Sequence, residues 1–178
     1  MTDKKDACDE LEQYDYSDGK HLEKVVDKYS PLIGLFLVNF SILEQDLNLA
    51  IADFMHDGCH ETGVVIIEKL TTSDKIDLFY KMYVRSESFN NKKLKTILDK
   101  LRNQLNDLNS FRNNIVHANW QSLTKSGFVR TKIVVDNQEG YVKFKKVEIT
   151  PKIVCQKIKE IEKLIDQINE YKETAFQF

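Results

Sequence analysis

The chain has 178 residues, 42% hydrophobic and 30% charged, which fits one folded domain with its own core rather than a disordered protein. Its net charge of −2 excludes a globally basic nucleic-acid-binding protein, so any polyanion site must be a local patch. Three scattered cysteines form no Cys-x-x-Cys pair, which favours a reducing compartment and indicates neither a disulfide framework nor a zinc site.

The N-terminal residues 1–19 are rich in aspartate and glutamate, which predicts a flexible acidic tail before a domain of residues 20–178. An interaction segment for a basic surface is the alternative. No basic region followed by an apolar run is present there, so we expect no secretory signal. The most apolar segment, residues 31–43, is too short to span a bilayer and is interrupted by Asn39. We therefore expect a cytoplasmic protein that does not enter a membrane.

Ser30 and Pro31 form a helix start, a capping hydroxyl followed by proline at the first helical position. We expect a short helix before them and a helix from there to about His56, with Gly58 as its stop. Residues 32–43 are apolar nearly all round, which predicts that this helix is the central, buried one.

Glu44 interrupts the apolar run of this helix. It is either a carboxylate at the rim of the buried stretch or the partner of a cation on a facing helix, and Arg112 is the candidate cation.

A group of potential metal ligands follows the helix: His56, Asp57, Cys59 and His60. Their spacing matches no established metal site, and Gly58 breaks the helix between the two histidines. We interpret this segment as a helix-end loop and expect neither a metal nor another cofactor.

Residues 61–70 predict a short helix, and Thr72 and Ser73 predict the cap of the next one. A polar connection, residues 85–91, leads into a long helix. Apolar residues recur in it at steps of three, four and seven, which predicts one buried face. These residues are Leu94, Ile97, Leu98, Leu101, Leu105, Leu108 and Ile115.

Arg112 projects about 20° from Leu101, in the middle of this apolar face, at about 100° of rotation per residue. A cation in that place must be paired, or lie where the face opens into a cleft or an interface. A lane of polar and aromatic residues also follows one flank of the helix at steps of three and four. Its members are Asn106, Asn109, Asn113, His117 and Trp120.

Residues 127–135 and 141–149 are rich in β-formers and flank a turn-forming segment, residues 136–140, which predicts a β-hairpin at about 127–149. Its basic side chains could hold phosphates or form an ordinary solvated face. These side chains are Arg130, Lys132, Lys143, Lys145 and Lys146. Thr150 and Pro151 then predict the start of a last helix that runs to about Thr174.

The end of the long helix reads Arg112-Asn113-Asn114-Ile115-Val116-His117. A helical chain with this segment, a hairpin and a closing helix resembles the HEPN superfamily (higher eukaryotes and prokaryotes nucleotide-binding). The signature of that family is an arginine, usually followed by a polar residue, with four to six residues before a histidine near the end of a long helix. This signature is matched by Arg112, Asn113 and His117. The resemblance in architecture covers roughly residues 20 to 175.

The resemblance implies a mainly α, HEPN-like helical bundle. The hairpin inserted before the last helix is a departure from the plainest form of that bundle. It implies a metal-independent endoribonuclease, of toxin or phage-defence type, with its active site composed at a homodimer interface. RNA is then the substrate, and an antitoxin or a nucleotidyltransferase is a candidate partner. Some members of the family only bind RNA, nucleotides or proteins, and that non-catalytic module is the alternative function.

The residues themselves agree with this chemistry. RNA cleavage without metal uses the ribose 2′-hydroxyl as nucleophile and needs a group that moves protons near neutral pH, for which His117 is suited. It also needs a cation for the charge of the phosphorane, and Arg112 offers fixed donors. Asn113 could orient the imidazole or hold a phosphate oxygen, while Trp120 either stacks on a base or packs in the core.

Each copy supplies one arginine and one histidine, whereas acid–base cleavage has two proton-transfer roles, which favours a dimer. Two residues are expected to support the site from nearby, Glu44 and Asn109. A third interpretation is a plain helical dimerisation subunit in which Arg112 and Glu44 form a structural contact.

Overall fold

The structure is a computed structural model, and it describes residues 19–55, 60–85, 92–117, 123–124, 127–135 and 142–175. Two compact units share the chain. The first comprises Met1–Leu35 and Asn114–Gln156, and the second comprises Phe36–Asn113 and Lys157–Phe178.

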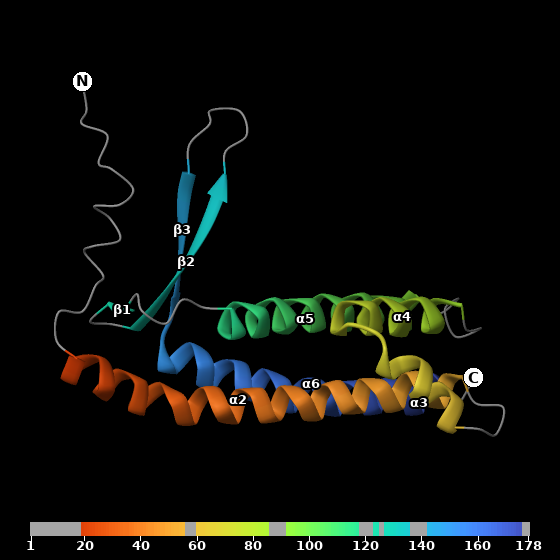
Figure 1. The fold of residues 1–178 in the computed structure, drawn as a ribbon. Helices are drawn as coiled ribbons and strands as arrows, with labels where there is room; N and C mark the ends of the chain where they lie inside the picture. The colour runs from red at the N-terminus through yellow and green to blue at the C-terminus, as the bar shows by residue number, and fades with distance from the viewer. Residues whose placement is uncertain are drawn as a thin grey trace. The chain divides into compact units, whose positions relative to one another are not determined.

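The described residues are mainly helical (Figure 1), which confirms the predicted mainly α class. The helices are α2 (Gly19–Phe54), α3 (His60–Glu68), α4 (Thr72–Val84), α5 (Lys92–Val116) and α6 (Pro151–Ala175). The strands are β1 (Leu123–Thr124), β2 (Gly127–Val135) and β3 (Val142–Ile149).

The strands belong to the first unit and form one antiparallel sheet in the order β1-β2-β3. The register of β2 and β3 runs from Phe128 opposite Ile149 to Val135 opposite Val142. The predicted turn between them, residues 136–140, lies outside the described residues.

The predicted helix start at Ser30 and Pro31 is wrong, because α2 runs without a break from Gly19 to Phe54 with Pro31 inside it. Proline lacks the amide N–H that would bond back along the helix. The preceding hydroxyl bonds backward instead of capping a new helix, since the Ser30 Oγ donates to the Val26 carbonyl at 2.8 Å. Such a backward bond is compatible with a continuing helix.

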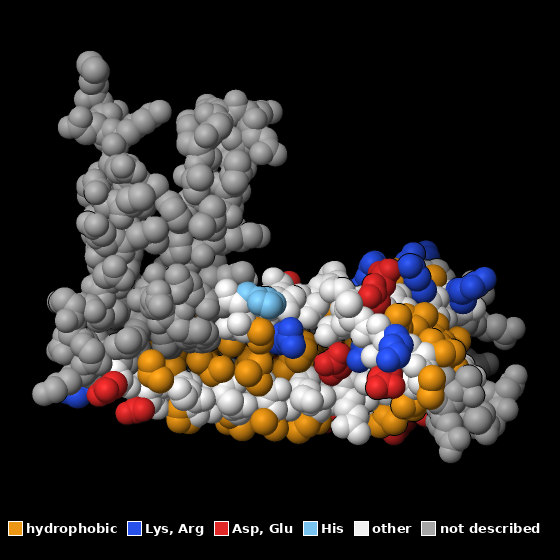
Figure 2. Space-filling model, viewed as in Figure 1, with side chains coloured by type: hydrophobic (Ala, Val, Ile, Leu, Met, Phe, Trp, Pro, Cys, Tyr) orange, Lys and Arg blue, Asp and Glu red, His pale blue; other side chains and the backbone are white. Residues whose placement is uncertain are grey.

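The expectation that this helix is the central, buried one is wrong for part of its surface, because it has one buried and one exposed apolar face. Phe36, Phe40 and Leu43 are buried, whereas Val38 is 59% and Ile42 is 47% exposed. Its neighbours in the second unit therefore cover one face of the helix, and the sequence is more apolar than the burial of that face requires. Figure 2 shows hydrophobic side chains along α2 on the face in view.

The length of α2 bears on the question of membranes. The continuous segment Val26–Phe54 is long and apolar enough to cross a bilayer by length and composition, unlike the shorter stretch considered above. The core helix of a soluble protein meets the same criterion, and 39% of the tested window is buried. The helix is therefore weak evidence for a membrane segment.

The predicted cap of α4 is shifted by one residue, because Thr71 and not Thr72 or Ser73 is the N-cap. The Asp74 amide donates to the Thr71 Oγ1 at 3.2 Å, and the Thr71 amide donates to the Asp74 carboxylate at 3.2 Å. This reciprocal capping box satisfies two amides that the first turn would leave unpaired. The predicted start of α6 is confirmed, since the Ile153 amide donates to the Thr150 Oγ1 at 3.3 Å.

In the second unit the helices pack as a bundle around a cluster of aromatic residues. The ring centroid of Tyr83 lies 4.8 Å from Phe79, 5.1 Å from Phe54 and 5.4 Å from Tyr171. These rings come from α2, α4 and α6, so the cluster joins three helices. The helix α3 lies against α2, because a Cβ at Gly63 would be only 3.4 Å from the Ala52 Cα.

Burial of two of these tyrosines predicts a loss of stability at alkaline pH. Burial raises the pKa of Tyr171 to about 12 and raises that of Tyr83 further, with the nearby Asp53 charge adding to the effect. A folded-state pKa above the unfolded value of about 10 gives stability that is complete below pH 10 and lost as the pH rises toward 12. In that pH window, each tyrosine lowers the free energy of unfolding by up to about 1.4 kcal/mol per pH unit.

We expect urea unfolding between pH 7 and 12 to show constant stability to about pH 10 and a decline above it. Tyr171→Phe should move the decline to higher pH, since it keeps the ring and removes the ionisable hydroxyl. An unchanged alkaline profile in Tyr171→Phe would contradict this assignment.

The predicted buried face of α5 is confirmed for most of its residues. Leu94, Leu98, Leu101, Leu105, Leu108 and Ile115 are buried, and Ile97 is exposed. The helix ends at Val116, earlier than the polar lane predicted, so Asn113 is the last member of that lane within the helix. Two β-branched residues, Ile115 and Val116, occupy its end, where their restricted side chains support the helix least.

Candidate functional site

Arg112 and Asn113 lie at the C-terminal end of α5 within the second unit. Both are half-buried. The Arg112 Nη1 donates to the Asn113 Oδ1 at 3.1 Å. This bond uses one of the five guanidinium donors and restricts the others to a narrower range of directions. Asn113 therefore positions Arg112, which is a more definite role than the sequence indicated.

The residue before Arg112 fixes this end of the helix. The Phe111 ring meets the Phe36 ring edge to face, with centroids 5.2 Å apart and planes at 82°. The Lys157 Nζ lies 6.0 Å from the centroid of the Phe111 ring and also pairs with Glu160. Edge-to-face aromatic pairs and cations over rings are both favourable arrangements. The backbone at Arg112 is thus anchored by α2 and α6.

His117 directly follows α5, and its side chain is exposed. Within the described part of the chain, no hydrogen bond to its imidazole is present. An exposed imidazole is accessible to a substrate from solvent, and histidine is the usual proton-transfer group near neutral pH.

Asn109 is buried, with 7% of its surface exposed, and its amide donates to the Ser73 Oγ at 3.0 Å. Ser73 lies in the first turn of α4, so this bond ties α5 to α4 one turn before Arg112. A buried amide is costly unless it is hydrogen-bonded. Asn109 accordingly supports the helix that carries the site, and it lies on the core side of the lane rather than toward solvent.

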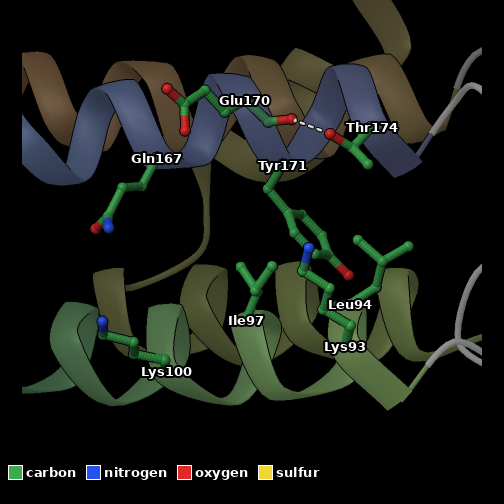
Figure 3. A pocket seen from close by; sticks show the side chains of 8 residues that line it. All are labelled: Lys93, Leu94, Ile97, Lys100, Gln167, Glu170, Tyr171 and Thr174. Carbon is green, nitrogen blue, oxygen red and sulfur yellow. Dashed lines mark hydrogen bonds between the residues drawn. The ribbon is translucent and has the colours of Figure 1, made fainter.

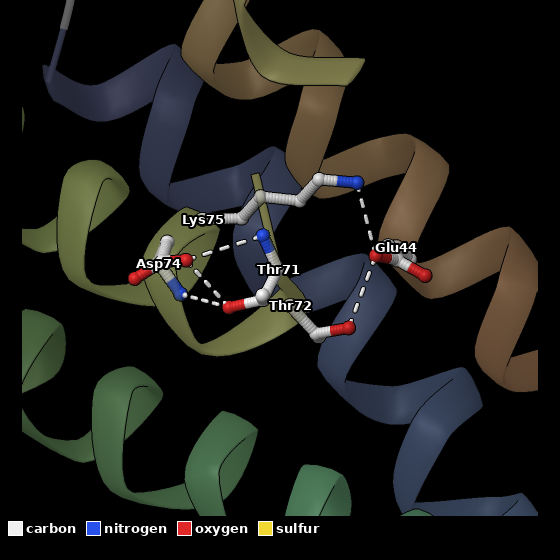
Figure 4. A network of polar contacts seen from close by, with 5 residues as sticks. All are labelled: Glu44, Thr71, Thr72, Asp74 and Lys75. Atoms are coloured by element: carbon white, nitrogen blue, oxygen red, sulfur yellow. Dashed lines mark hydrogen bonds and ion pairs between the residues drawn. The ribbon is translucent and has the colours of Figure 1, made fainter. Parts of the chain in front are cut away.

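The candidate pair of Glu44 and Arg112 is not formed. The Glu44 Oε1 instead accepts hydrogen bonds from the Lys75 Nζ at 3.0 Å and from the Thr72 Oγ1 at 3.1 Å (Figure 4). The physical reason is proximity: α4 supplies a cation and a hydroxyl that already satisfy this carboxylate oxygen. Arg112 consequently has Asn113 as its acceptor and is not neutralised by Glu44.

Lys75 is a residue that the sequence analysis did not single out, although a signal was present. It precedes Phe79 by four residues and Tyr83 by eight, so it lies on the buried face of α4. Its side chain is only 9% exposed, and that of Glu44 is 28% exposed. A lysine on an apolar helix face needs a partner, and Glu44 is that partner.

Truncating Lys75 should destabilise the protein without touching the candidate site. Among the described residues, Lys75→Ala leaves the partly buried Glu44 carboxylate with Thr72 as its remaining donor. We therefore expect a loss of about 1–3 kcal/mol in the free energy of unfolding. Urea titration followed by circular dichroism measures this loss.

Lys81→Ala is the matched control on the same helix. Lys81 also forms an ion pair, with Asp77 at 2.8 Å, but its side chain is 70% exposed. Exposed ion pairs contribute little to stability, so we expect Lys81→Ala to lower the free energy of unfolding by less than about 0.5 kcal/mol. The double variant Lys75→Met with Glu44→Leu should regain most of the stability. Equal stability of Lys75→Ala and wild type would show that the pair is not structural.

The other predicted residues are placed only in part. The backbone register sets Lys132 opposite Lys145, Thr131 opposite Lys146 and Val134 opposite Lys143. The side chains of the predicted RNA-binding residues, Arg130, Lys132, Lys143, Lys145 and Lys146, lie outside the described ones. Further predictions also fall outside them: the acidic tail, residues 1–18, Trp120, and the side chains of the His56–His60 loop.

The second unit offers the Arg112 guanidinium, which the Asn113 amide positions, and the first unit offers the exposed His117 imidazole. Such groups can bind a phosphate and move a proton. Among the residues that the structure describes, no group of three or more histidine, cysteine or acidic side chains could hold a metal ion. No model of a known protein family matches this chain, and neither does any characterised protein or solved structure.

Proposed function

We propose that this protein is a metal-independent endoribonuclease of HEPN type, in which Arg112 stabilises the phosphorane and His117 transfers the proton. The observation that carries the proposal is the state of Arg112. It is positioned by Asn113 and is not neutralised by Glu44, whose carboxylate pairs with Lys75. Among the described residues the guanidinium is held by its hydrogen bond to Asn113, and a guanidinium so placed suits the developing charge of a cleaved phosphodiester.

The proposed reaction needs no cofactor. His117 removes the proton of the ribose 2′-hydroxyl, the oxygen attacks the adjacent phosphorus, and the 5′-oxygen of the next nucleotide leaves with a proton. A second histidine, from a second copy of the chain, supplies that proton. The products are an RNA with a 2′,3′-cyclic phosphate and an RNA with a 5′-hydroxyl.

The exposed apolar face of α2 supports association of two copies. Val38, Ile42 and Leu49 are each close to half exposed on one helix of the second unit. Single exposed apolar residues are ordinary, but a row at helical spacing is typical of an interface. We therefore propose a cytoplasmic homodimer whose interface covers this row. The fold is a HEPN-like bundle, and its hairpin is an arm that holds RNA. An antitoxin or a nucleotidyltransferase is the proposed regulator.

Cleavage of RNA in EDTA tests the proposal. A purified protein that yields 2′,3′-cyclic phosphate or 3′-phosphate ends supports it, and intact RNA over a wide range of sequences contradicts it.

A non-catalytic RNA-binding module is the second candidate function. The absence of a hydrogen bond to the His117 imidazole within the described residues favours it, because a proton-transfer histidine is usually oriented by a partner. In this case RNA binding survives His117→Ala and is lost when Lys143, Lys145 and Lys146 are neutralised.

A further inference from the structure

A concave site lies between α5 and α6 in the second unit, away from the end of α5 that carries Arg112. The cavity has a volume of about 470 Å³. Cavities of this size accommodate small organic ligands. Its lining comes equally from the two helices (Figure 3): Lys93, Leu94, Ile97, Lys100, Gln167, Glu170, Tyr171 and Thr174.

The inner wall of this cavity is apolar. Leu94 and Tyr171 are buried beneath it, and Ile97 is partly exposed at its mouth. Figure 3 shows Ile97 and Tyr171 reaching into the gap from opposite helices. Burial raises the pKa of Tyr171 to about 12, so its hydroxyl is neutral and can donate. This wall suits an apolar, ring-sized body.

The polar rim carries more positive than negative charge. Lys93 and Lys100 are exposed residues seven positions apart on α5, about 10.5 Å along the helix axis, so they lie toward the two ends of the cavity. The carboxylate of Glu170 lies over α6 and not in the gap toward α5 (Figure 3). An anionic group is therefore the charge that this rim favours.

Gln167 supplies a hydrogen-bond acceptor. Its Oε1 is buried and accepts no hydrogen bond from the residues that the structure describes. Figure 3 shows its amide directed from α6 into the gap, on the same side as Lys100. A buried carbonyl oxygen without a donor costs free energy, and a donor on a bound molecule would satisfy it.

We propose that this cavity binds a small organic anion with an apolar ring body and one N–H or O–H donor. The ring lies against Ile97 and Tyr171, the anion contacts a lysine of the rim, and the donor bonds to the Gln167 Oε1. The proposal is independent of RNA cleavage, since none of its residues belongs to the Arg112 site.

Four indole compounds test the contributions of the ring, the anion and the donor one at a time, because all four contain the same ring. Indole-3-acetate has the anion and the N–H donor, 1-methylindole-3-acetate lacks the donor, tryptamine replaces the anion by a cation, and indole has no charge. Binding is followed by titration of the Ile97 and Leu94 methyl resonances at low salt, where charge effects are least screened. We expect indole-3-acetate to bind with a Kd of about 0.1–1 mM, as small ligands with few contacts do.

The methylated compound and tryptamine should each bind at least about fivefold more weakly, which corresponds to roughly 1 kcal/mol per lost interaction. The variant Lys93→Ala with Lys100→Ala should weaken indole-3-acetate and leave indole unchanged. Gln167→Leu should abolish the difference between indole-3-acetate and its methylated form. Lys95→Ala removes an exposed lysine of the same helix that does not line the cavity, and it should bind like wild type.

Three results would overturn the proposal: no methyl shifts with any of the four compounds, tryptamine binding as tightly as indole-3-acetate, or full affinity in the double lysine variant. Each is decided with the folded chain of 178 residues.

Discussion

Replacing His117 by alanine is expected to reduce RNA cleavage by about 10²–10⁴-fold, the usual contribution of the proton-transfer group that the proposed mechanism makes it. The protein should keep its stability, because the His117 side chain is exposed and its truncation leaves no cavity. The initial rate on a fluorescent RNA in EDTA measures the first effect, and urea unfolding measures the second.

The same reasoning applies to Arg112 with an additional distinction. In the proposed mechanism the Arg112 guanidinium stabilises the phosphorane, so we expect Arg112→Ala to lower the cleavage rate by about 10²–10³-fold. Arg112→Lys keeps the charge but not the planar fork, and it should recover little of the activity. Asn103→Ala changes an exposed residue of the same helix and should cleave like wild type. Full activity in both Arg112→Met and His117→Ala would exclude the proposed catalytic roles and favour a scaffold.

Introducing a charge on the exposed face of α2 is expected to dissociate the proposed dimer. Ile42 is 47% exposed and lies four residues from Val38, which is 59% exposed. A glutamate at position 42 would be buried without a partner in a contact between apolar surfaces, so Ile42→Glu should raise the dimer Kd by about 10²–10³-fold. Sedimentation velocity over a range of concentrations measures the change.

Cleavage should fall together with dimerisation and return at high protein concentration. Asn103→Glu is the matched control, since it adds the same charge to an exposed position on α5 and should leave the dimer intact. The composite site would be contradicted if wild-type monomer cleaves RNA, or if Ile42→Glu remains a dimer with full activity.

Helix α2 shows what the apolar character of a segment predicts and what it does not. The burial of Phe36, Phe40 and Leu43 follows from the apolar character of residues 32–43. The exposure of Val38 and Ile42 does not, because an all-round apolar helix gives no indication of which face the neighbouring helices cover. The start at Pro31 was misjudged because a proline inside a helix and a proline at its first position have the same local sequence.

The burial of Arg112 was predictable from the sequence, but the hydrogen-bond partners of the candidate residues were not. The half-buried position of Arg112 follows from its angle to Leu101 on α5. The partner of Glu44 does not follow from periodicity, since two helices each presented a cation, and only their packing decides between Lys75 and Arg112. The hydrogen bond from Arg112 to Asn113 could not be predicted either. Both side chains have several staggered conformations, and the sequence does not indicate which of them brings the two groups together.

The most direct test of the central claim compares an RNA oligonucleotide with its DNA counterpart of the same sequence, both incubated with purified wild-type protein in EDTA. The proposed mechanism requires the 2′-hydroxyl, so it predicts that the RNA is cut to products with 2′,3′-cyclic phosphate ends and that the DNA stays intact. RNA that remains uncut, or RNA products that end in a 3′-hydroxyl, would contradict it.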